Sequence, residues 1–240
     1  MNALIIQARI GSKRLKNKML LPLAGKPMIF RIIERLKRVK KVKKLILAIP
    51  NTKEDNRIAN IFKNENIIIF RGSENNLVER YYLAAKKYKI KTIIRFPGDN
   101  CLPEPKEIDR LIKFYEKFKK PFFASNLSNI MHNGYPDGIG AEIFGLNFLE
   151  DLMSKKLNKS QKEHPHTNFF DYNKNKPINE KWCKVRTFKC PKKIKRPDIK
   201  LDVNTLNEYN YMANIYKNLY HKDAKFNISK TIDFLDKNEK

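Results

Sequence analysis

Short apolar runs alternate with stretches of helical periodicity through the first half of the chain. Leu4-Ile5-Ile6 is a compact apolar run that predicts a buried strand. Between Met28 and Val39 the apolar residues recur at helical spacing, which predicts an amphipathic helix. The same pattern predicts strands at 4–6, 45–49, 67–70, 92–96 and 122–124, and helices at 28–39, 53–63, 74–88 and 105–118. This alternation indicates an α/β fold, with a mostly parallel sheet sandwiched by helices.

From about Gly134 the alternation gives way to a mixed pattern. Strands are predicted at 140–144 and 183–188, and helices at 147–153, 204–219 and 229–236. The segment from 160 to 181 is polar and mixed. Because no linker or internal repeat divides the chain, we predict a single domain over 1–240 with an inserted lobe near 130–195.

Ligands of parallel α/β sheets bind beyond the carboxyl ends of the strands, so the loops after the first and fourth strands are the places to search. The first loop runs from Gln7 to Lys18 and contains Arg9, Gly11, Ser12, Arg14 and further lysines. Open backbone N–H groups and fixed cations suit a triphosphate. Neither GxxxxGK[ST] nor GxGxxG is present, and a flexible basic loop is the alternative interpretation.

The loop after the fourth strand contains Asp99 directly behind Gly98. A carboxylate in this position is a hard oxygen ligand suited to Mg²⁺, although an Asx-turn or a helix cap would use the same residue. A second carboxylate, Asp202, precedes the helix predicted at 204–219. It either caps that helix or meets Asp99 across the site, where two carboxylates sharing a metal would suit nucleotidyl transfer.

Charge and cysteine content indicate which partners and which cellular compartment to expect. The 240 residues contain 51 Lys and Arg against 25 Asp and Glu, giving a formal net charge of +26, which raises nucleic acid, an anionic membrane or an anionic small ligand as partners. The lysines are spread along the chain, which is typical of a solvated surface. The 3 cysteines form no CxxC pair, no window is apolar enough to span a membrane, and no signal peptide is evident. We therefore expect a reduced, cytoplasmic protein without a membrane partner.

Two segments near the N-terminus are distinctive, IIQARIGSKRL at 5–15 and KMLLPLAGKP at 18–27. They resemble the opening of the cytidylyltransferase family, which includes spore-coat polysaccharide biosynthesis proteins and the 3-deoxy-manno-octulosonate and acylneuraminate cytidylyltransferases. The resemblance continues in order through 70–74, 78–82, Arg95 with 98–99, 125–126, 163–164 and 201–203. It covers nearly the whole chain and is nearest to the spore-coat branch.

The resemblance implies a GT-A-like nucleotidyltransferase fold and a defined reaction. An activated sugar or acid would attack the α-phosphate of CTP, giving a CMP-linked product and pyrophosphate for surface polysaccharide. By this resemblance, the residues expected to bind the nucleotide and its phosphates are Gln7, Ala8, Arg9, Gly11, Ser12, Arg14, Lys18 and Gly98. Within this set Gln7 and Ala8 would lie against the nucleoside. Arg9, Lys18 and Asp99 would be catalytic, and Asp99 with Asp202 would bind Mg²⁺.

The acceptor is expected in the lobe, and this part of the chain departs most from the family pattern. The candidate acceptor residues are Asn126, Asp137, Glu142 and His164. Asp137 also fits an ordinary turn, and His164 a structural hydrogen bond. The family's Gly-Asp-Cys-Pro is replaced by GDNCLP at 98–103, and Lys162 stands where an Arg is usual before Glu-His. A homodimer through the lobe is compatible with the resemblance.

Two alternatives belong to other functional classes. A GT-A glycosyltransferase would share the fold, but it usually carries Asp-x-Asp, and Asp99-Asn100-Cys101 lacks the second Asp. A specific nucleic-acid-binding protein would need clustered Arg with exposed aromatic residues, whereas Lys dominates here. We therefore expect no specific nucleic-acid partner.

Overall fold

A seven-stranded sheet forms the centre of the molecule in the computed structural model, which describes residues 1–238. Its strand order is β11-β7-β8-β6-β1-β4-β5. The strands are β1 (Asn2–Gln7), β4 (Leu45–Pro50), β5 (Ile68–Gly72), β6 (Thr92–Pro97), β7 (Phe123–Ser125), β8 (Glu142–Gly145) and β11 (Val185–Arg186). All neighbouring strands pair in parallel except β8, which is antiparallel to β6 and β7. The mostly parallel α/β fold predicted from the apolar runs is confirmed.

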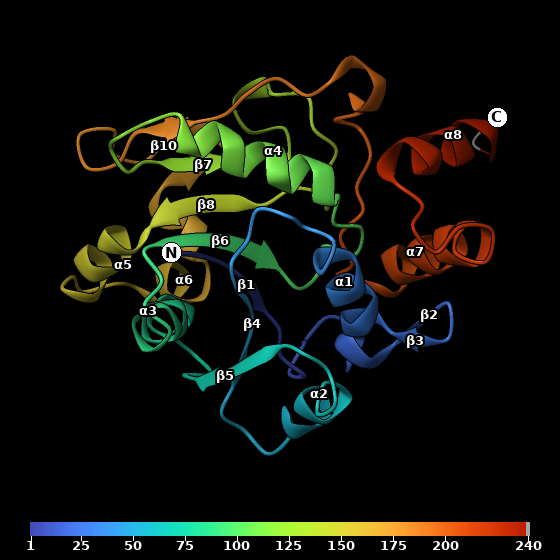
Figure 1. Ribbon diagram of the computed structural model, residues 1–240, viewed down its shortest axis with the longest axis horizontal. Coiled ribbons are helices and arrows are strands. Elements are labelled where there is room, and N and C mark those ends of the chain that lie inside the picture. Colours follow the sequence, from blue (N-terminus) through green and yellow to red (C-terminus); the bar gives the residue numbers. More distant parts are fainter. Residues whose placement is uncertain (239–240) are drawn as a thin grey trace.

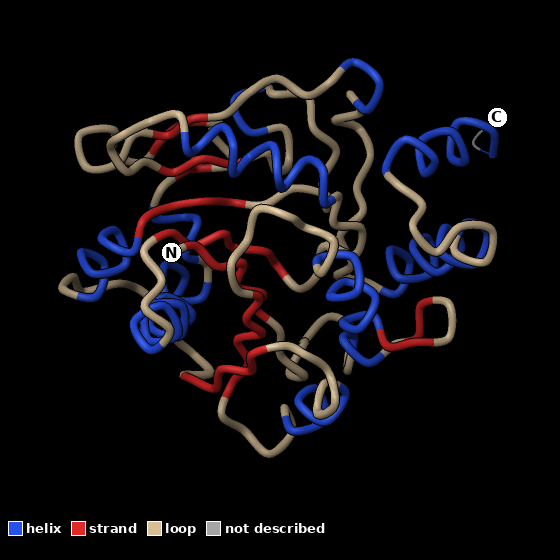
Figure 2. Tube along the Cα trace, in the orientation of Figure 1, coloured by secondary structure: helices blue, strands red, loops and turns tan. Residues whose placement is uncertain are grey.

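Helices cover both faces of this sheet because β1 is apolar on both sides. Leu4 and Ile6 pack into one core, and Ala3 and Ile5 into the other. The helices are α1 (Met28–Leu36), α2 (Asn56–Ile61), α3 (Leu77–Lys87), α4 (Pro105–Glu116), α5 (Leu146–Met153), α6 (Lys159–Glu163), α7 (Leu206–Leu219) and α8 (Ile228–Asn238). Core residues of α1, α4, α7 and α8 lie on the first face, and those of α3 and α5 on the second. Figure 2 shows the strands inside this surround of helices.

Shorter elements complete the chain. They are the 3-10 helices η1 (Lys18–Leu20), η2 (Ile130–His132), η3 (Pro165–Asn168) and η4 (Lys192–Ile194), and the two-stranded sheets β2 (Pro22–Leu23) with β3 (Lys26–Pro27) and β9 (Phe170–Asp171) with β10 (Lys176–Pro177). The segment 130–195, expected as an inserted lobe, contributes β8 and β11 to the central sheet and places α6, η3, β9 and β10 outside it. Helix α7 lies beside α1 (Figure 1), and Arg31 of α1 lies over the ring of Tyr220 at the end of α7. Within residues 1–238, no helix is long and apolar enough to cross a membrane.

Candidate active site

Two loops leave the same edge of the sheet and are joined there by a distant segment. β1 and β6 are parallel neighbours with Gln7 opposite Pro97, so the loops that follow them start side by side. The stretch 201–203 then hydrogen-bonds to the second loop, because Val203 N–H donates to the Asp99 carbonyl at 2.9 Å and Cys101 N–H donates to the Leu201 carbonyl at 3.1 Å. This pairing brings Asp202 to the loop that carries Asp99.

Close packing of Gly98 fixes the position of Asp99. A Cβ atom on Gly98 would lie 2.2 Å from the Gln7 carbonyl oxygen. The backbone of the second loop therefore rests directly on the end of β1, which only glycine permits. Gly11, in the first loop, has no atom within 4 Å of an added Cβ and so borders open space.

The carboxylates at this edge carry an excess of negative charge. Burial raises the pKa of Asp202 to about 6, and the neighbouring Asp137 and Asp99 add to the effect. Asp137 is held by the Ser128 hydroxyl at 2.6 Å and by Gly138 N–H at 2.8 Å. A carboxylate whose pKa is raised by its acidic neighbours is a good ligand for a hard cation, which would offset the repulsion.

Asp99 and Asp202 therefore fit a Mg²⁺ ion that takes its remaining ligands from phosphate and water. The described residues contain no preformed group of three or more His, Cys, Asp or Glu side chains that could hold a metal. The donor set matches an ion that arrives with a phosphate ligand, because Mg²⁺ is usually held by one or two carboxylates together with substrate phosphates.

Cationic side chains from the first loop meet these carboxylates. Lys18 is only 8% exposed, and its Nζ lies 3.4 Å from Asp99 Oδ2 and donates to the Val203 carbonyl at 2.8 Å. Arg14 Nη2 donates to Asn204 Oδ1 at 2.7 Å, and Asn204 Nδ2 donates to Asp202 Oδ2 at 2.5 Å. Asn204 thus links the cationic loop to the acidic segment. The sequence placed Asn204 only at the start of a helix and did not predict that it lies between these cations and carboxylates.

A buried polar network extends from Gln7 at the end of β1. Gln7 Oε1 accepts hydrogen bonds from Tyr81 Oη at 3.0 Å and from Arg95 Nε at 3.1 Å. Arg95 Nη1 also donates to Glu142 Oε2 at 2.5 Å, and Tyr172 Oη donates to Glu142 Oε1 at 2.9 Å. Because an arginine Nε can only donate, the atom of Gln7 that faces it must be the oxygen, and the Gln7 NH₂ group points away from the network. Tyr81, Arg95 and Tyr172 were not among the predicted site residues.

The four predicted acceptor residues separate into two pairs. Asn126 is fully buried, with its Nδ2 donating to the Glu107 carbonyl at 3.0 Å and its Oδ1 accepting from Ala141 N–H at 2.9 Å. Glu142 is 1% exposed and is occupied by the network just described. The polar atoms of both side chains are therefore bonded within the protein. Asp137 lies near Asp202, as described above, and His164 is only partly exposed.

His164 is close enough to Arg95, Arg9 and Asp99 to interact with their charges. Partial burial lowers the pKa of His164, and the positive charges of Arg95 and Arg9 lower it further. Burial and Arg95 also lower the pKa of His166 to about 4. Both imidazoles are therefore neutral at neutral pH and can accept as well as donate a hydrogen bond.

The remaining predicted residues, Ala8 and Ser12, follow β1 in the first loop, with Ala8 N–H bonded to the Ala48 carbonyl at 3.3 Å and Ser12 N–H to the Ile10 carbonyl at 2.7 Å.

Comparison with known proteins adds an independent finding. The sequence model of one protein family, described as cytidylyltransferase, matches residues 3–238. An uncharacterized protein of Methanocaldococcus jannaschii is 34% identical over 98% of this chain and 90% of its own length. The spore coat polysaccharide biosynthesis protein SpsF of Bacillus subtilis is 26% identical over 89% of this chain and 85% of its own. The solved structure of a cytidylyltransferase from Leptospira borgpetersenii aligns over 99% of this chain and 94% of that one, with a TM-score of 0.85 and 27% identity.

Proposed function

The chain belongs to the cytidylyltransferase family, and we propose that it transfers CMP from CTP to a sugar, or to an acidic or phosphorylated small acceptor, for surface polysaccharide or glycoconjugate synthesis. The observation that carries the assignment of the site is the contact of Lys18 with Asp99, Val203 and Asn204 at the carboxyl edge of β1 and β6. The name of the relative from Bacillus subtilis supports the polysaccharide pathway. Family membership favours this function over the glycosyltransferase and nucleic-acid-binding alternatives.

The first loop is the proposed triphosphate site. Arg9 and Arg14 are exposed cations and Gly11 borders open space, so backbone and side-chain donors can approach phosphate oxygens there. Lys18 and Ser12 complete the phosphate contacts. The Gln7 NH₂ group, Ala8 and the Gly98 backbone are the proposed contacts of the nucleoside.

In the proposed reaction, an acceptor oxygen attacks the α-phosphorus of CTP; a carboxylate or phosphate oxygen attacks in its ionised form, and a hydroxyl releases its proton to water. One P–O bond forms, the bond between the α-phosphorus and the bridging oxygen breaks, and pyrophosphate leaves with its electron pair. The cations Lys18, Arg9 and Arg14 stabilise the negative charge that develops on the leaving group, so little covalent chemistry is required of the protein. Mg²⁺ held by Asp99 and Asp202 would supply Lewis-acid stabilisation of the phosphate oxygens.

On the acceptor side, Asp137 and His164 are the proposed contacts. Asn126 and Glu142 act as positioning residues, because their polar atoms are already bonded within the protein. A role of the 130–195 segment in dimerisation and a cytoplasmic location remain predictions from sequence.

Pyrophosphate release tests the proposal directly. CTP and Mg²⁺ are incubated with a panel of acidic sugars, phosphorylated sugars and small phosphorylated acceptors, and UTP is run in parallel. Asp99→Ala is expected to abolish turnover while leaving the fold intact, and Asp233→Ala, at an exposed position, serves as the matched control. Failure of CTP with Mg²⁺ to bind or to raise the melting temperature would overturn the function. Full activity of Asp99→Ala would remove this residue from the mechanism.

A further inference from the structure

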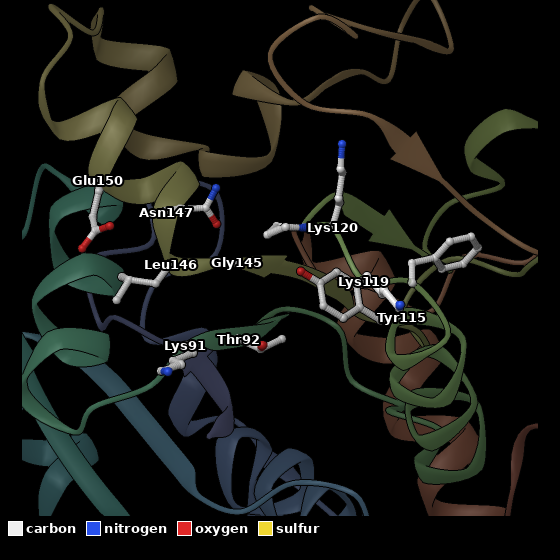
Figure 3. Close-up of a pocket in the computed structure, with 11 residues that line it drawn as sticks. Lys91, Thr92, Tyr115, Lys119, Lys120, Gly145, Leu146, Asn147 and Glu150 are labelled. Atoms are coloured by element: carbon white, nitrogen blue, oxygen red, sulfur yellow. The ribbon is translucent and has the colours of Figure 1, made fainter.

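A hollow lies at the opposite end of the two central strands from Asp99. β6 begins at Thr92, which pairs with Gly145 at the end of β8, whereas Arg95 and Glu142 pair toward the active-site edge. A pocket of about 430 Å³ opens at the Thr92 end, between the end of α4 and the start of α5 (Figure 3). This volume is in the range of small-molecule sites. The pocket shares no lining residue with the proposed active site, so its interpretation does not depend on the proposed function.

The charge of this pocket is positive. Lys91, Lys119 and Lys120 line it, and none of them makes an ion pair within residues 1–238. Glu150 is the acidic residue of the lining, and its carboxylate already pairs with Lys86 at 3.5 Å. Three uncompensated ammonium groups around one hollow attract an anion, and a phosphomonoester brings close to two negative charges.

The body of the pocket combines apolar surface with neutral hydrogen-bonding groups. Leu146 and the rings of Tyr115 and Phe118 provide the apolar surface, and Phe118 is 37% exposed. The Tyr115 hydroxyl and the Asn147 amide point into the space between α4 and α5 (Figure 3). Burial raises the pKa of Tyr115 to about 12, so its hydroxyl stays protonated and can donate.

We propose that this pocket is a second ligand site, which binds a sugar phosphate. The lysines hold the phosphate at the rim, while Tyr115, Asn147 and Thr92 contact the hydroxyl groups and the Tyr115 ring packs against the sugar. A purely apolar ligand would leave the three lysines without a counter-charge. Inorganic phosphate alone would leave the aromatic and apolar wall unused.

Isothermal titration calorimetry with glucose 6-phosphate as the probe tests this site, using the full chain without CTP, so that no transfer reaction contributes heat. Glucose and inorganic phosphate are titrated in parallel. The triple variant Lys91→Ala, Lys119→Ala, Lys120→Ala is expected to weaken binding of the probe at least tenfold. A triple variant with the same charge change, Lys192→Ala, Lys193→Ala, Lys222→Ala, removes exposed lysines outside the pocket and is expected to bind as the wild type does.

A second pocket variant and an active-site variant separate the remaining outcomes. Asn147→Asp places a negative charge in the pocket and is expected to weaken binding of the probe. His164→Ala, at a proposed acceptor contact of the active site, is expected to leave binding of the probe unchanged. Equal losses in the two triple variants would mean general electrostatic attraction and would overturn the proposal. Absence of binding, or binding of inorganic phosphate as tightly as the sugar phosphate, would also overturn it. Loss of binding in His164→Ala with the pocket variants unaffected would place the ligand in the active site and would overturn the proposal as well.

Discussion

Asp202 carries a thermodynamic cost in the metal-free protein, and the sign and size of this cost follow from its surroundings. Burial, Asp137 and Asp99 raise the pKa of Asp202 from 3.8 to about 6. A shift of this size is worth about 3 kcal/mol at about 1.4 kcal/mol per pKa unit. Because the side chain is partly exposed, solvent screening reduces the expected cost to about 1–2 kcal/mol.

The cost has a defined pH dependence. Below about pH 4 the carboxyl is protonated in both the folded and the unfolded chain, and it costs nothing. As the pH rises through about 4 to 6, the unfolded chain ionises first, so the free energy of unfolding falls; above about 6 the loss is complete. Asp202→Asn removes the titration and keeps an oxygen that can accept from Asn204. We therefore expect this variant to be more stable than the wild type by about 1–2 kcal/mol near pH 8, with little difference near pH 4.

Urea unfolding of both proteins with a chelator, at about pH 4 and about pH 8, measures this difference. The same variant should lose the stabilisation that CTP and Mg²⁺ give the wild type. Asp198→Asn is the control, because a hydrogen bond from Arg196 lowers the pKa of Asp198, and its replacement should slightly destabilise the protein at neutral pH. An Asp202→Asn variant that is less stable than the wild type near pH 8, or that differs from it equally at both pH values, would refute the reasoning.

Three further predictions concern other groups at this edge. Lys18→Met should lower kcat/KM for CTP by at least about 100-fold, because it removes a cation from the phosphate site, while Lys16→Met on the exposed part of the same loop should have little effect. Glu142→Gln should lower the free energy of unfolding by about 3–5 kcal/mol in urea, because Arg95 would stay buried without its counter-charge, and a change below about 1 kcal/mol would contradict this. The lowered pKa of His166 predicts that stability falls as the pH decreases from about 6.5 to about 4, since the unfolded chain takes up the proton. His166→Gln should remove about 2–3 kcal/mol of that fall in acid unfolding curves, and identical curves would show that another group is responsible.

The sequence was sufficient to predict most of the local elements. Apolar runs and helical spacing depend on neighbours along the chain, so β1, β4, β6 and α1 were predicted within a few residues of their observed bounds. The predicted helix at 53–63 was too long, because α2 covers only Asn56–Ile61. The direction of β8 could not be read from its apolar pattern, since a buried strand has the same composition in parallel and antiparallel pairs.

The pairing of distant residues was decided only by the tertiary structure. Asp99 and the cations of the first loop were proposed as site residues because a position after a strand is a local property. For Asp202 the sequence left two interpretations open, a helix cap or a neighbour of Asp99, and the hydrogen bonds between 201–203 and 99–101 bring it to the loop that carries Asp99. The sequence likewise showed Asn126 and Glu142 as polar residues that could face a ligand. Folding instead bonded their polar atoms inside the protein, because a buried polar group must find a partner and the nearest partners come from distant parts of the chain.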